Sequence, residues 1–415
     1  MNLYASLEPN LRRNLGILFV AGLVFWSSTT AMLPTIPLYV QFLGGNDRQV
    51  GFVMGAFAIG LLLSRRQLGG LADRHSRKIV LLVGTFVATI APLGYLLADS
   101  IPFLFGIRIF HGVSIAAFTT AYSALVADLA PPQHRGQLIG HMTLVAPLGF
   151  ATGPMLGGFV QSEYGHAPLF FLAALLGGIS FVLTARSRDS ERNTATIVTD
   201  NNENANSFFR LLASRKIRIP TLVMLFGGLL FGTISSFIPL YLKSAQIDLN
   251  PGWFYTSAAV GSFSMRLFCG RASDRLGRGI FLSVACGLYL VSMLALWRAN
   301  TPQFFLLAAF IEGLAAGIFI PMSIALVSDR SYPQERGRTF SLCIGGFDLG
   351  VAIAGPVLGT IAYEIGYRDL FGIAAAIAAI SLVFFCTQNS KDLPHSLRFA
   401  TGRERDIYAI QPSEW

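Results

Sequence analysis

Long apolar runs alternate with short polar segments along almost the whole chain. A helix needs about 20 apolar residues to cross the roughly 30 Å hydrocarbon core of a bilayer. Twelve runs come close to this length or exceed it, so the pattern predicts an all-α membrane protein with twelve transmembrane helices. The predicted spans cover roughly residues 14–40, 49–66, 79–98, 102–127, 136–160, 167–185, 218–243, 251–270, 279–297, 302–328, 338–362 and 367–386.

The composition agrees with a chain that spans a membrane many times. Hydrophobic residues make up 53% of the chain, charged residues only 13%, and the mean hydropathy is +0.57, whereas soluble domains carry about 25% charged residues. The first apolar run follows Arg12 and Arg13 but is too long for a signal peptide, and no clear cleavage site follows it. We therefore expect it to remain as the first span.

The positive charges predict the orientation of the chain. Of the 31 Lys and Arg residues, four fall on one side of the twelve-span arrangement, namely Arg48, Lys243, Arg298 and Arg368, and Arg108 falls inside a span. All the others fall on the opposite side, which the positive-inside rule assigns to the cytoplasm. Both termini are thus expected in the cytoplasm of an inner-membrane protein. The net charge of +9 then reflects short inner loops and does not indicate nucleic-acid binding.

A polar segment without a long apolar run separates two sets of six spans. We expect a cytoplasmic N-terminus at 1–13, a six-helix bundle at 14–185, a linker at 186–217, a second six-helix bundle at 218–386 and a cytoplasmic tail at 387–415. The linker and the tail are polar, and we expect the tail to be disordered.

The two sets of spans repeat one another. The stretch GGLADRHSRK at 69–78 is echoed by GRASDRLGR at 270–278, at a constant spacing of 201 residues. Ile-Pro-Leu-Tyr at 36–39 returns at 238–241, and Pro-Gln-x-Arg-Gly at 132–136 returns at 333–337. Internal repeats of this size are typical of transporters, whose substrate sites lie at the midplane between the repeats.

The repeated polar stretch resembles the loop signature of the major facilitator superfamily between the second and third spans. This resemblance implies the major facilitator fold of two pseudo-symmetric six-helix bundles, and a cytoplasmic gate at this loop. Ser76 departs from it, since the family usually has Gly there, and we expect the turn to be tightened differently. A plain positively charged loop is the alternative. The gate candidates are Gly69, Asp73, Arg74, Arg77, Lys78, Gly270, Asp274, Arg275 and Arg278.

The fifth span carries the string GHMTLVAPLGFATGPMLGG. Three of its glycines are four residues apart and form a smooth stripe that lets another helix approach closely, although simple helix packing would need the same stripe. The string is similar to the signature of the drug:proton antiporters, the twelve-helix branch of the family. The residues that match it are Gly140, Gly149, Gly153, Pro154, Gly157 and Gly158.

Four polar residues fall inside predicted spans. Arg108 and His111 in span 4 resemble the family motif of an intramembrane Arg followed by Gln-Gly, with His111 in place of Gln. A charge at mid-membrane is costly and usually faces an aqueous cavity, so the partner of Arg108 must come from backbone, substrate or the other half. Glu312 and Asp348 each lie about 15 Å along their spans, and Glu312 aligns with His111 in the repeat. These four are candidates for proton coupling or substrate contact; a fixed hydrogen bond to a neighbouring helix is the alternative.

Other features carry less information about function. We expect Asp128 and Asp329 to cap helix ends, while Phe25 and Trp26 would line a cavity or simply pack. The four cysteines have no metal-ligand spacing, and neither a nucleotide-binding loop nor a catalytic triad is present. We therefore expect no cofactor, no metal and no enzymatic activity.

Together these features predict a secondary transporter that exports a small amphipathic compound in exchange for protons by alternating access. Its expected partners are the substrate, protons and the lipid bilayer, and we expect a monomer. A proton-coupled importer of a sugar, organic acid or other nutrient is the first alternative. A membrane receptor or enzyme on a transporter scaffold is the second, but it would need a soluble domain or a catalytic cluster.

Overall fold

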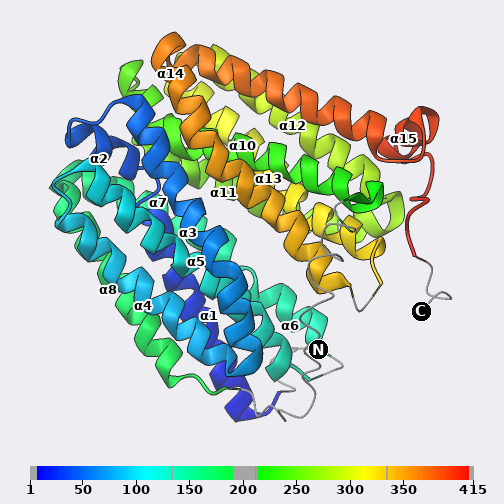
Figure 1. Ribbon diagram of the computed structural model, residues 1–415, viewed down its shortest axis with the longest axis horizontal. Helices are drawn as coiled ribbons and strands as arrows, with labels where there is room; N and C mark the ends of the chain where they lie inside the picture. Colours follow the sequence, from blue (N-terminus) through cyan, green and yellow to red (C-terminus); the bar gives the residue numbers. More distant parts are fainter. Residues whose placement is uncertain (1–6, 132–133, 190–210, 212, 333–334, 411–415) are drawn as a thin grey trace. The chain divides into compact units, whose positions relative to one another are not determined.

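The computed structural model describes residues 7–131, 134–189, 211, 213–332 and 335–410. Every regular element in these ranges is a helix (Figure 1). The prediction of an all-α protein is therefore confirmed.

The chain forms two compact units. The first contains the described residues of Met1–Gly45, Phe52–Val198 and Asn250–Thr256, and the second contains those of Asn46–Gly51, Thr199–Leu249 and Ser257–Trp415. Most of the expected linker lies outside the described residues.

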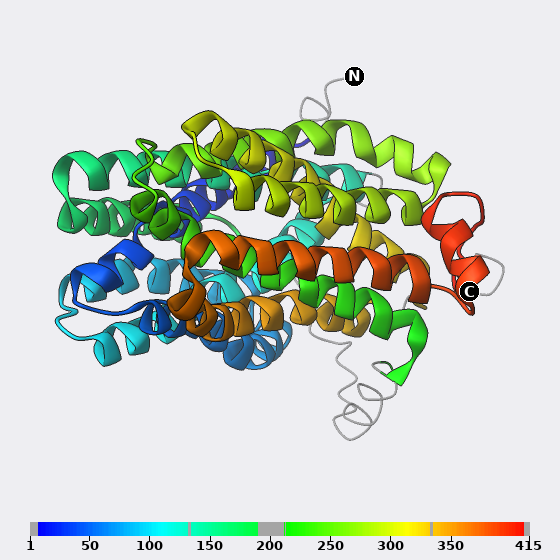
Figure 2. The same ribbon diagram turned by 90° about the horizontal axis from the view of Figure 1, so that it is seen from above.

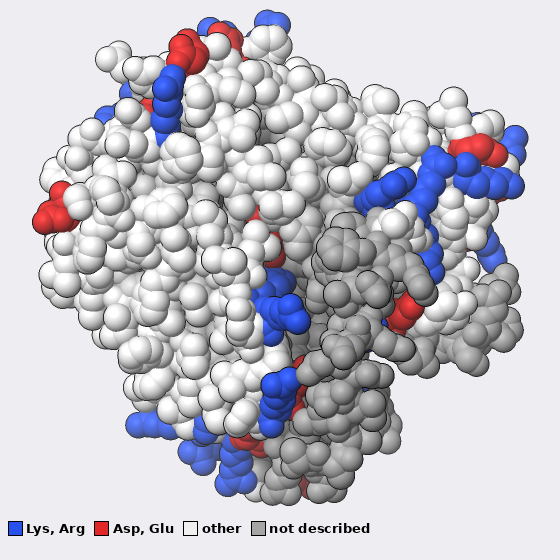
Figure 3. Space-filling model, in the orientation of Figure 1, with Lys and Arg blue, Asp and Glu red and all other residues white. Residues whose placement is uncertain are grey.

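In the first unit, long helices lie side by side. Its helices are α1 (Pro9–Ala31), α2 (Ile36–Phe42), most of α3 (Asp47–Arg74), α4 (Arg77–Leu96), α5 (Ile101–Leu129), α6 (Arg135–Met142), α7 (Val145–Tyr164) and α8 (His166–Arg186). Helix α1 packs on α7 and α8, and α4 packs on α5 and α8. The outward surface of α4 and α8 exposes Phe86, Phe171 and Leu175, and it is free of charge between the helix ends (Figure 3).

The second unit repeats this arrangement. Its helices are α10 (Arg215–Ser244), most of α11 (Pro251–Leu276), α12 (Arg278–Arg298), α13 (Pro302–Asp329), α14 (Arg336–Gln388) and α15 (Leu393–Ala400). Helix α10 packs on α14, and α12 packs on α13 and α14. Each unit thus buries its core between helices that follow the same order along the chain.

The described helices account for twelve membrane crossings. Ten helical segments in the described ranges are long and apolar enough to span a membrane, and α1 with α2 and α6 with α7 each count as one of them. Helix α14 supplies two crossings, because Gly366 breaks it with φ 83° and ψ 166°. Helix α11, with 26 residues, is about 39 Å long and completes the twelve.

The sequence repeat is reproduced in the close contacts between helices. A Cβ atom on Gly112 of α5 would overlap the backbone carbonyl of Phe57 on α3. In the second unit, a Cβ atom on Gly313 of α13 would overlap the carbonyl of Ala258 on α11 in the same way. Each pair holds two helices at backbone contact, which larger side chains would prevent.

The repeated Ile-Pro-Leu-Tyr segments have matching roles. The Tyr39 hydroxyl donates to the Tyr95 carbonyl oxygen at the end of α4, over 3.0 Å. The Tyr241 hydroxyl donates to the Leu296 carbonyl oxygen near the end of α12, over 3.3 Å. Both tyrosines satisfy carbonyls that helix ends leave without intrahelical partners.

The tail is folded, so the expectation of disorder is wrong for its described part. Helix α15 packs on α12 and α14 (Figures 1 and 2). The fully buried Arg330 anchors the segment that follows α15, because its guanidinium pairs with Asp406 over 2.6 Å and donates to Asn389 Oδ1 over 3.0 Å. Asp392 caps α15, and the backbone amide of His395 that donates to it lowers the pKa of this carboxyl. This cap is therefore lost only as the pH falls through that lowered pKa.

Replacing Arg330 by methionine is expected to release the tail. Breaking a buried ion pair by removing one partner costs about 3–5 kcal/mol, because the other charge is left uncompensated. Limited proteolysis of the purified protein should then cleave between residues 400 and 410 much faster than in the wild type. The Asp406→Asn variant, which keeps a hydrogen-bond acceptor, should lie between the two. Equal cleavage rates in all three proteins would contradict this role of Arg330.

Candidate functional site

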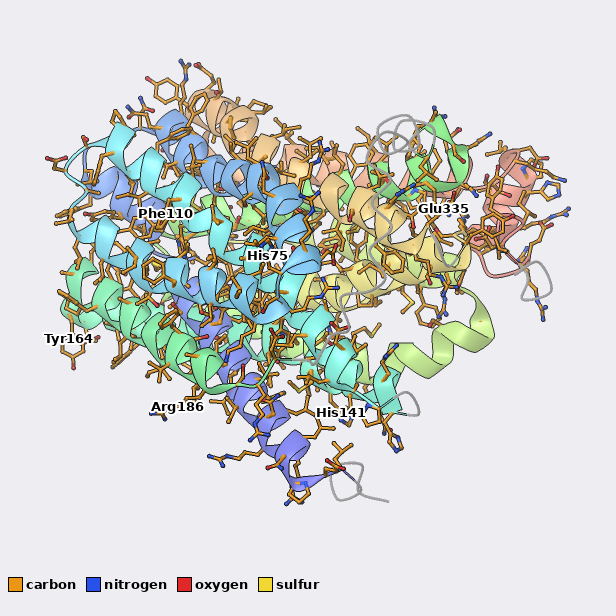
Figure 4. All side chains as sticks on the ribbon, turned by 60° about the horizontal axis from the view of Figure 1, so that its bottom comes forward. His75, Phe110, His141, Tyr164, Arg186 and Glu335 are labelled. Carbon is orange, nitrogen blue, oxygen red and sulfur yellow. The ribbon has the colours of Figure 1, made fainter. Side chains whose placement is uncertain are left out.

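The turn between α3 and α4 holds the first copy of the polar motif, where His75 is labelled in Figure 4. The Arg77 guanidinium lies 2.7 Å from Asp73 and 3.5 Å from Asp128 at the end of α5. The Arg77 side chain is only 14% exposed, compared with 60% for Asp73 and 27% for Asp128. Arg77 therefore links three helices at one end of the first unit.

The serine in place of the family's glycine has a structural role. Ser76 is extended, with φ −158°, and its hydroxyl caps α4 by accepting from the Ile79 amide over 3.1 Å. It also hydrogen-bonds to Asp189. At the matching place in the second unit, Gly277 has φ +88°, a conformation that favours glycine. The turn is thus built differently in the two copies, as the sequence predicts.

The second copy keeps the central ion pair. Arg278 lies 3.2 Å from Asp329 at the end of α13, which matches Arg77 and Asp128. Asp128 and Asp329, expected to cap helix ends, are instead paired with these arginines. The side chains of Asp274 and Arg275 lie outside the described residues, as does the environment of Gly270.

The remaining members of the first copy differ in their surroundings. Lys78 donates to the carbonyl oxygens of Ala185 and Ser187 at the end of α8, over 2.8 and 2.6 Å. Arg74 is exposed at the last residue of α3. Gly69 has room for a side chain, so packing among the described residues does not explain its glycine.

Replacing Arg77 by glutamine is expected to slow transport up to about fivefold, because partly exposed ion pairs contribute about 0.2–1 kcal/mol each. The measurement is initial transport rate together with thiol accessibility of a cysteine placed in the same turn. His75→Gln is the matched control, because this neighbouring side chain is exposed. If Arg77→Gln transports at the wild-type rate with unchanged thiol accessibility, the motif does not act as the gate.

The glycine stripe of α7 faces α1. A Cβ atom on Gly153 would overlap Thr30, and one on Gly157 would overlap the Ala31 carbonyl. The Thr30 hydroxyl donates to the Gly149 carbonyl oxygen over 2.9 Å, which ties the two backbones together. The stripe therefore brings α7 and α1 into backbone contact along two turns of helix.

The other members of the span-5 motif lie in different surroundings. Gly140 is in the short helix α6, and a Cβ atom there would meet nothing within 4 Å. Pro154 lies inside α7, and Gly158 is buried beside Gly157. Among the described residues, then, only part of the motif is explained by close packing.

The second unit reaches the same helix contact with other residues. The glycines there are shared between α14, where a Cβ atom on Gly350 would overlap the Leu225 carbonyl, and α10, where one on Gly228 would overlap the Phe347 carbonyl. The position that matches Gly157 is Leu358, which is buried. The glycines are thus divided between the two helices, so the glycine pattern of span 5 is only partly repeated in span 11.

Arg108 is buried in the first unit and contacts neutral groups. Its Nε lies 3.5 Å from the Val53 carbonyl oxygen, its Nη2 lies 3.9 Å from the Met54 sulfur, and its guanidinium stands 4.6 Å from the centre of the Phe57 ring. These three contacts come from α3 and leave the positive charge in place, and the Tyr95 side chain of α4 interacts with Arg108 as well. The Val53 carbonyl and the Phe57 ring therefore offset part of the cost of burying the Arg108 charge.

His111 lies beside Arg108 and is fully buried. Its Nδ1 is 2.9 Å from the Tyr95 hydroxyl, and Phe57 packs edge-on against its ring at 5.3 Å. Its Nε2 has no hydrogen-bond partner among the described residues. The structure thus brings Arg108, His111, Tyr95 and Phe57 together, and we call this group the arginine–histidine cluster.

The two intramembrane acids lie in the second unit. Glu312 of α13 is 6% exposed and lies within electrostatic range of Tyr289 on α12. It forms no ion pair in the part of the chain that the structure describes. Asp348 of α14 is 8% exposed. His111 and Glu312 each precede the glycine that packs its helix closely on α3 or α11, so their places in the two units match.

Aromatic rings form a second group near the glycine stripe. Phe25 stacks on Phe118 at 3.9 Å, and Trp26 lies 5.6 Å from Phe150 on α7. Trp26 and Phe150 are only half-buried, whereas Phe25 is fully buried. The sequence did not single out Tyr95, Tyr289, Phe57 or Phe118, because no motif marks them.

Comparison with known proteins places this geometry in a family. The family model described as Major Facilitator Superfamily matches residues 18–265 and 248–409. The multi-drug resistance efflux pump PmrA homolog of Lactococcus lactis is 26% identical over 384 residues, which cover 90% of this chain and 92% of that protein. The multidrug resistance protein MdtG of Enterobacter lignolyticus is 25% identical over 395 residues, with 92% and 94% covered.

Solved structures support the same fold. A bacterial homolog to the human lysosomal transporter Spinster aligns with a TM-score of 0.75 at 15% identity, covering 98% of this chain and all of that one. The nucleoside transporter NupG aligns with a TM-score of 0.73 at 16% identity, covering 90% and 98%. With two matching units of membrane-spanning helices, the chain belongs to the Major Facilitator Superfamily and is a membrane transporter rather than an enzyme.

Proposed function

We propose that this transporter exports small amphipathic compounds in exchange for protons. The observation that carries the proposal is the glycine motif of span 5, whose central residues hold α7 against α1 at backbone contact. Two relatives that align with this chain over more than nine-tenths of their own length are named multidrug efflux proteins. Import of a nutrient remains the competing proposal.

The half-buried rings beside the stripe suit an amphipathic substrate. Trp26 and Phe150 present apolar faces, and aromatic rings also attract ligand cations by about 0.5–2 kcal/mol. We assign these two rings to the substrate surface of the first unit. The fully buried Phe25 and Phe118 pack against Trp26 and hold it in place.

Glu312 is the proposed proton carrier, with Asp348 as a second acid. A charged carboxylate at mid-membrane is costly, so a proton or a cationic substrate on Glu312 would remove that cost. Binding of one then favours release of the other, which is the requirement for antiport. Arg108 and His111 of the first unit are separately assigned to proton coupling or substrate contact, and Tyr95 is the positioning residue that holds the His111 ring.

The function can be tested with purified protein in liposomes. A pH gradient across the liposome membrane should drive an amphipathic dye such as ethidium from the alkaline to the acidic side, opposite to the flow of protons. Addition of an ionophore that collapses the gradient should reverse the accumulation. Dye that moves together with protons, or sugars and organic acids that accumulate in its place, would favour the importer. Dye movement that ignores the gradient would overturn proton coupling.

We further propose that both termini face the cytoplasm of an inner membrane and that the protein works as a monomer. The excess of Lys and Arg on one side of the spans supports the orientation. Protease added to right-side-out vesicles should leave a tag at the C-terminus intact. Cleavage of that tag would show that the C-terminus faces the other side of the membrane.

A further inference from the structure

Two adjoining cavities lie where α10 begins and α14 ends. The first, of about 460 Å³, is lined by Arg215, Arg218, Ile219 and Leu222 of α10 and by Phe384 and Gln388 of α14. The second, of about 450 Å³, is lined by Ala379, Ile380, Val383, Phe384, Thr387 and Gln388. Because Phe384 and Gln388 line both, the two cavities form one groove, which we call the α10–α14 groove.

One end of the groove is positively charged. The Arg215 guanidinium donates to the carbonyl oxygens of Gln388 and Lys391, each over 3.1 Å, and to Gln388 Oε1 over 3.0 Å. These acceptors are neutral, so they fix the guanidinium without cancelling its charge. Arg218 lies one turn further along α10 and is exposed. The lining of the groove contains no acidic side chain among the described residues.

The other end of the groove is apolar and open to the side. Ile380 is 55% exposed and Val383 is 60% exposed, and both lie within the last membrane-spanning part of α14. Arg215 is the first residue of one span and Gln388 is the last residue of another. The charged end therefore lies at the level of the lipid headgroups, and the apolar end lies at the level of the acyl chains.

We propose that the α10–α14 groove binds an anionic phospholipid, with the phosphate at Arg215 and Arg218 and an acyl chain along Ile380 and Val383. Basic pockets between membrane helices are suited to anionic headgroups, and a planar guanidinium held in place binds phosphate through two hydrogen bonds. A free phosphate would use only the charged end, whereas a lipid uses the whole groove. This inference is independent of the proposed substrate and coupling ion.

The test places a fluorescent reporter in the groove. The Phe384→Trp protein is reconstituted in nanodiscs that contain either brominated phosphatidylglycerol or brominated phosphatidylcholine at equal mole fraction. Quenching of the added tryptophan should be several-fold stronger with the anionic lipid. The wild-type protein supplies the background of the natural tryptophans.

Removal of the charges should remove the preference. Arg218→Gln, added to Phe384→Trp, is expected to lower the preference about fivefold, since one basic residue near the surface contributes about 1 kcal/mol. Arg215→Gln should have a similar or larger effect. Because Arg215 also binds Gln388 and Lys391, its loss could loosen the tail, and Arg218→Gln tests the charge without that complication. Arg186→Gln is the matched control, because Arg186 is exposed at the corresponding end of α8 (Figure 4) and its loss should change nothing.

Three outcomes would overturn the proposal. Equal quenching by the two lipids would mean ordinary contact with bulk lipid. A preference that survives both arginine substitutions, or falls equally with Arg186→Gln, would mean that the charges of the groove do not select the headgroup. Loss of quenching on addition of inorganic phosphate would mean that the site takes a free anion.

Discussion

The Glu312→Gln variant is expected to lose transport against a gradient while keeping exchange of substrate for substrate. Glutamine preserves the size of the side chain and its hydrogen-bonding capacity, but it cannot take up or release a proton. Glu312 is almost fully buried near the middle of α13 and forms no ion pair among the described residues, so nothing there balances its charge permanently. Accumulation driven by a pH gradient in liposomes should fall to the level of empty liposomes.

Control variants separate coupling from damage to the fold. Glu163→Gln, at an exposed carboxyl near the end of α7, should transport like the wild type. His111→Gln restores the residue that the family motif usually has. It should be tolerated if the His111 imidazole only replaces that glutamine and has no role of its own in coupling. Asp348→Asn and the double variant with Glu312→Gln test whether the second acid shares the role. Concentrative transport at the wild-type rate by the double variant would show that neither acid couples transport to protons.

The membrane-spanning architecture could be predicted from the sequence because its physical cause is local. A bilayer supplies no hydrogen-bond partners, so each crossing of an all-α protein must be helical and apolar over a sufficient length. The repeat added the division into two units, and the matched contacts of Gly112 and Gly313 show that it extends to backbone packing. The two acids and the arginine could also be predicted as candidates, because ionisable residues are rare inside apolar runs.

The neighbours of these candidates could not be predicted. Phe57 and Tyr95 reach His111 from helices α3 and α4, and an aromatic residue in an apolar run looks the same whether it faces lipid or a functional side chain. The partners of Arg108 include a carbonyl, a thioether and a ring, and no motif in the sequence marks any of them. Such contacts depend on which faces of the helices meet.

The tail shows a different limit. Its polar composition suggested disorder, but one buried arginine, Arg330, orders it by binding Asp406 more than seventy residues later in the chain. The buried Phe399 adds an apolar contact with Phe385 of α14. Composition averages over a segment and therefore misses stability that comes from two or three specific contacts.

A single methyl group added at Gly157 is expected to disrupt the first unit. The Cβ atom of alanine at this position would overlap the carbonyl oxygen of Ala31, and backbone cannot move aside as a flexible side chain can. Forcing extra volume into a packed interior typically costs about 1–3 kcal/mol, and here α7 must move away from α1. We expect a lower melting temperature in detergent and a severe loss of transport.

Gly140→Ala is the matched control for this effect, because it adds the same methyl group to the same motif where nothing lies within 4 Å. It should melt and transport like the wild type if the motif acts through helix contact. The matching place of the second unit holds the buried Leu358, so the close contact that Gly157 makes with Ala31 is specific to the first unit. If Gly157→Ala and Gly140→Ala behave alike, backbone contact between α7 and α1 is not what the motif provides, and the assignment to antiport loses its main support.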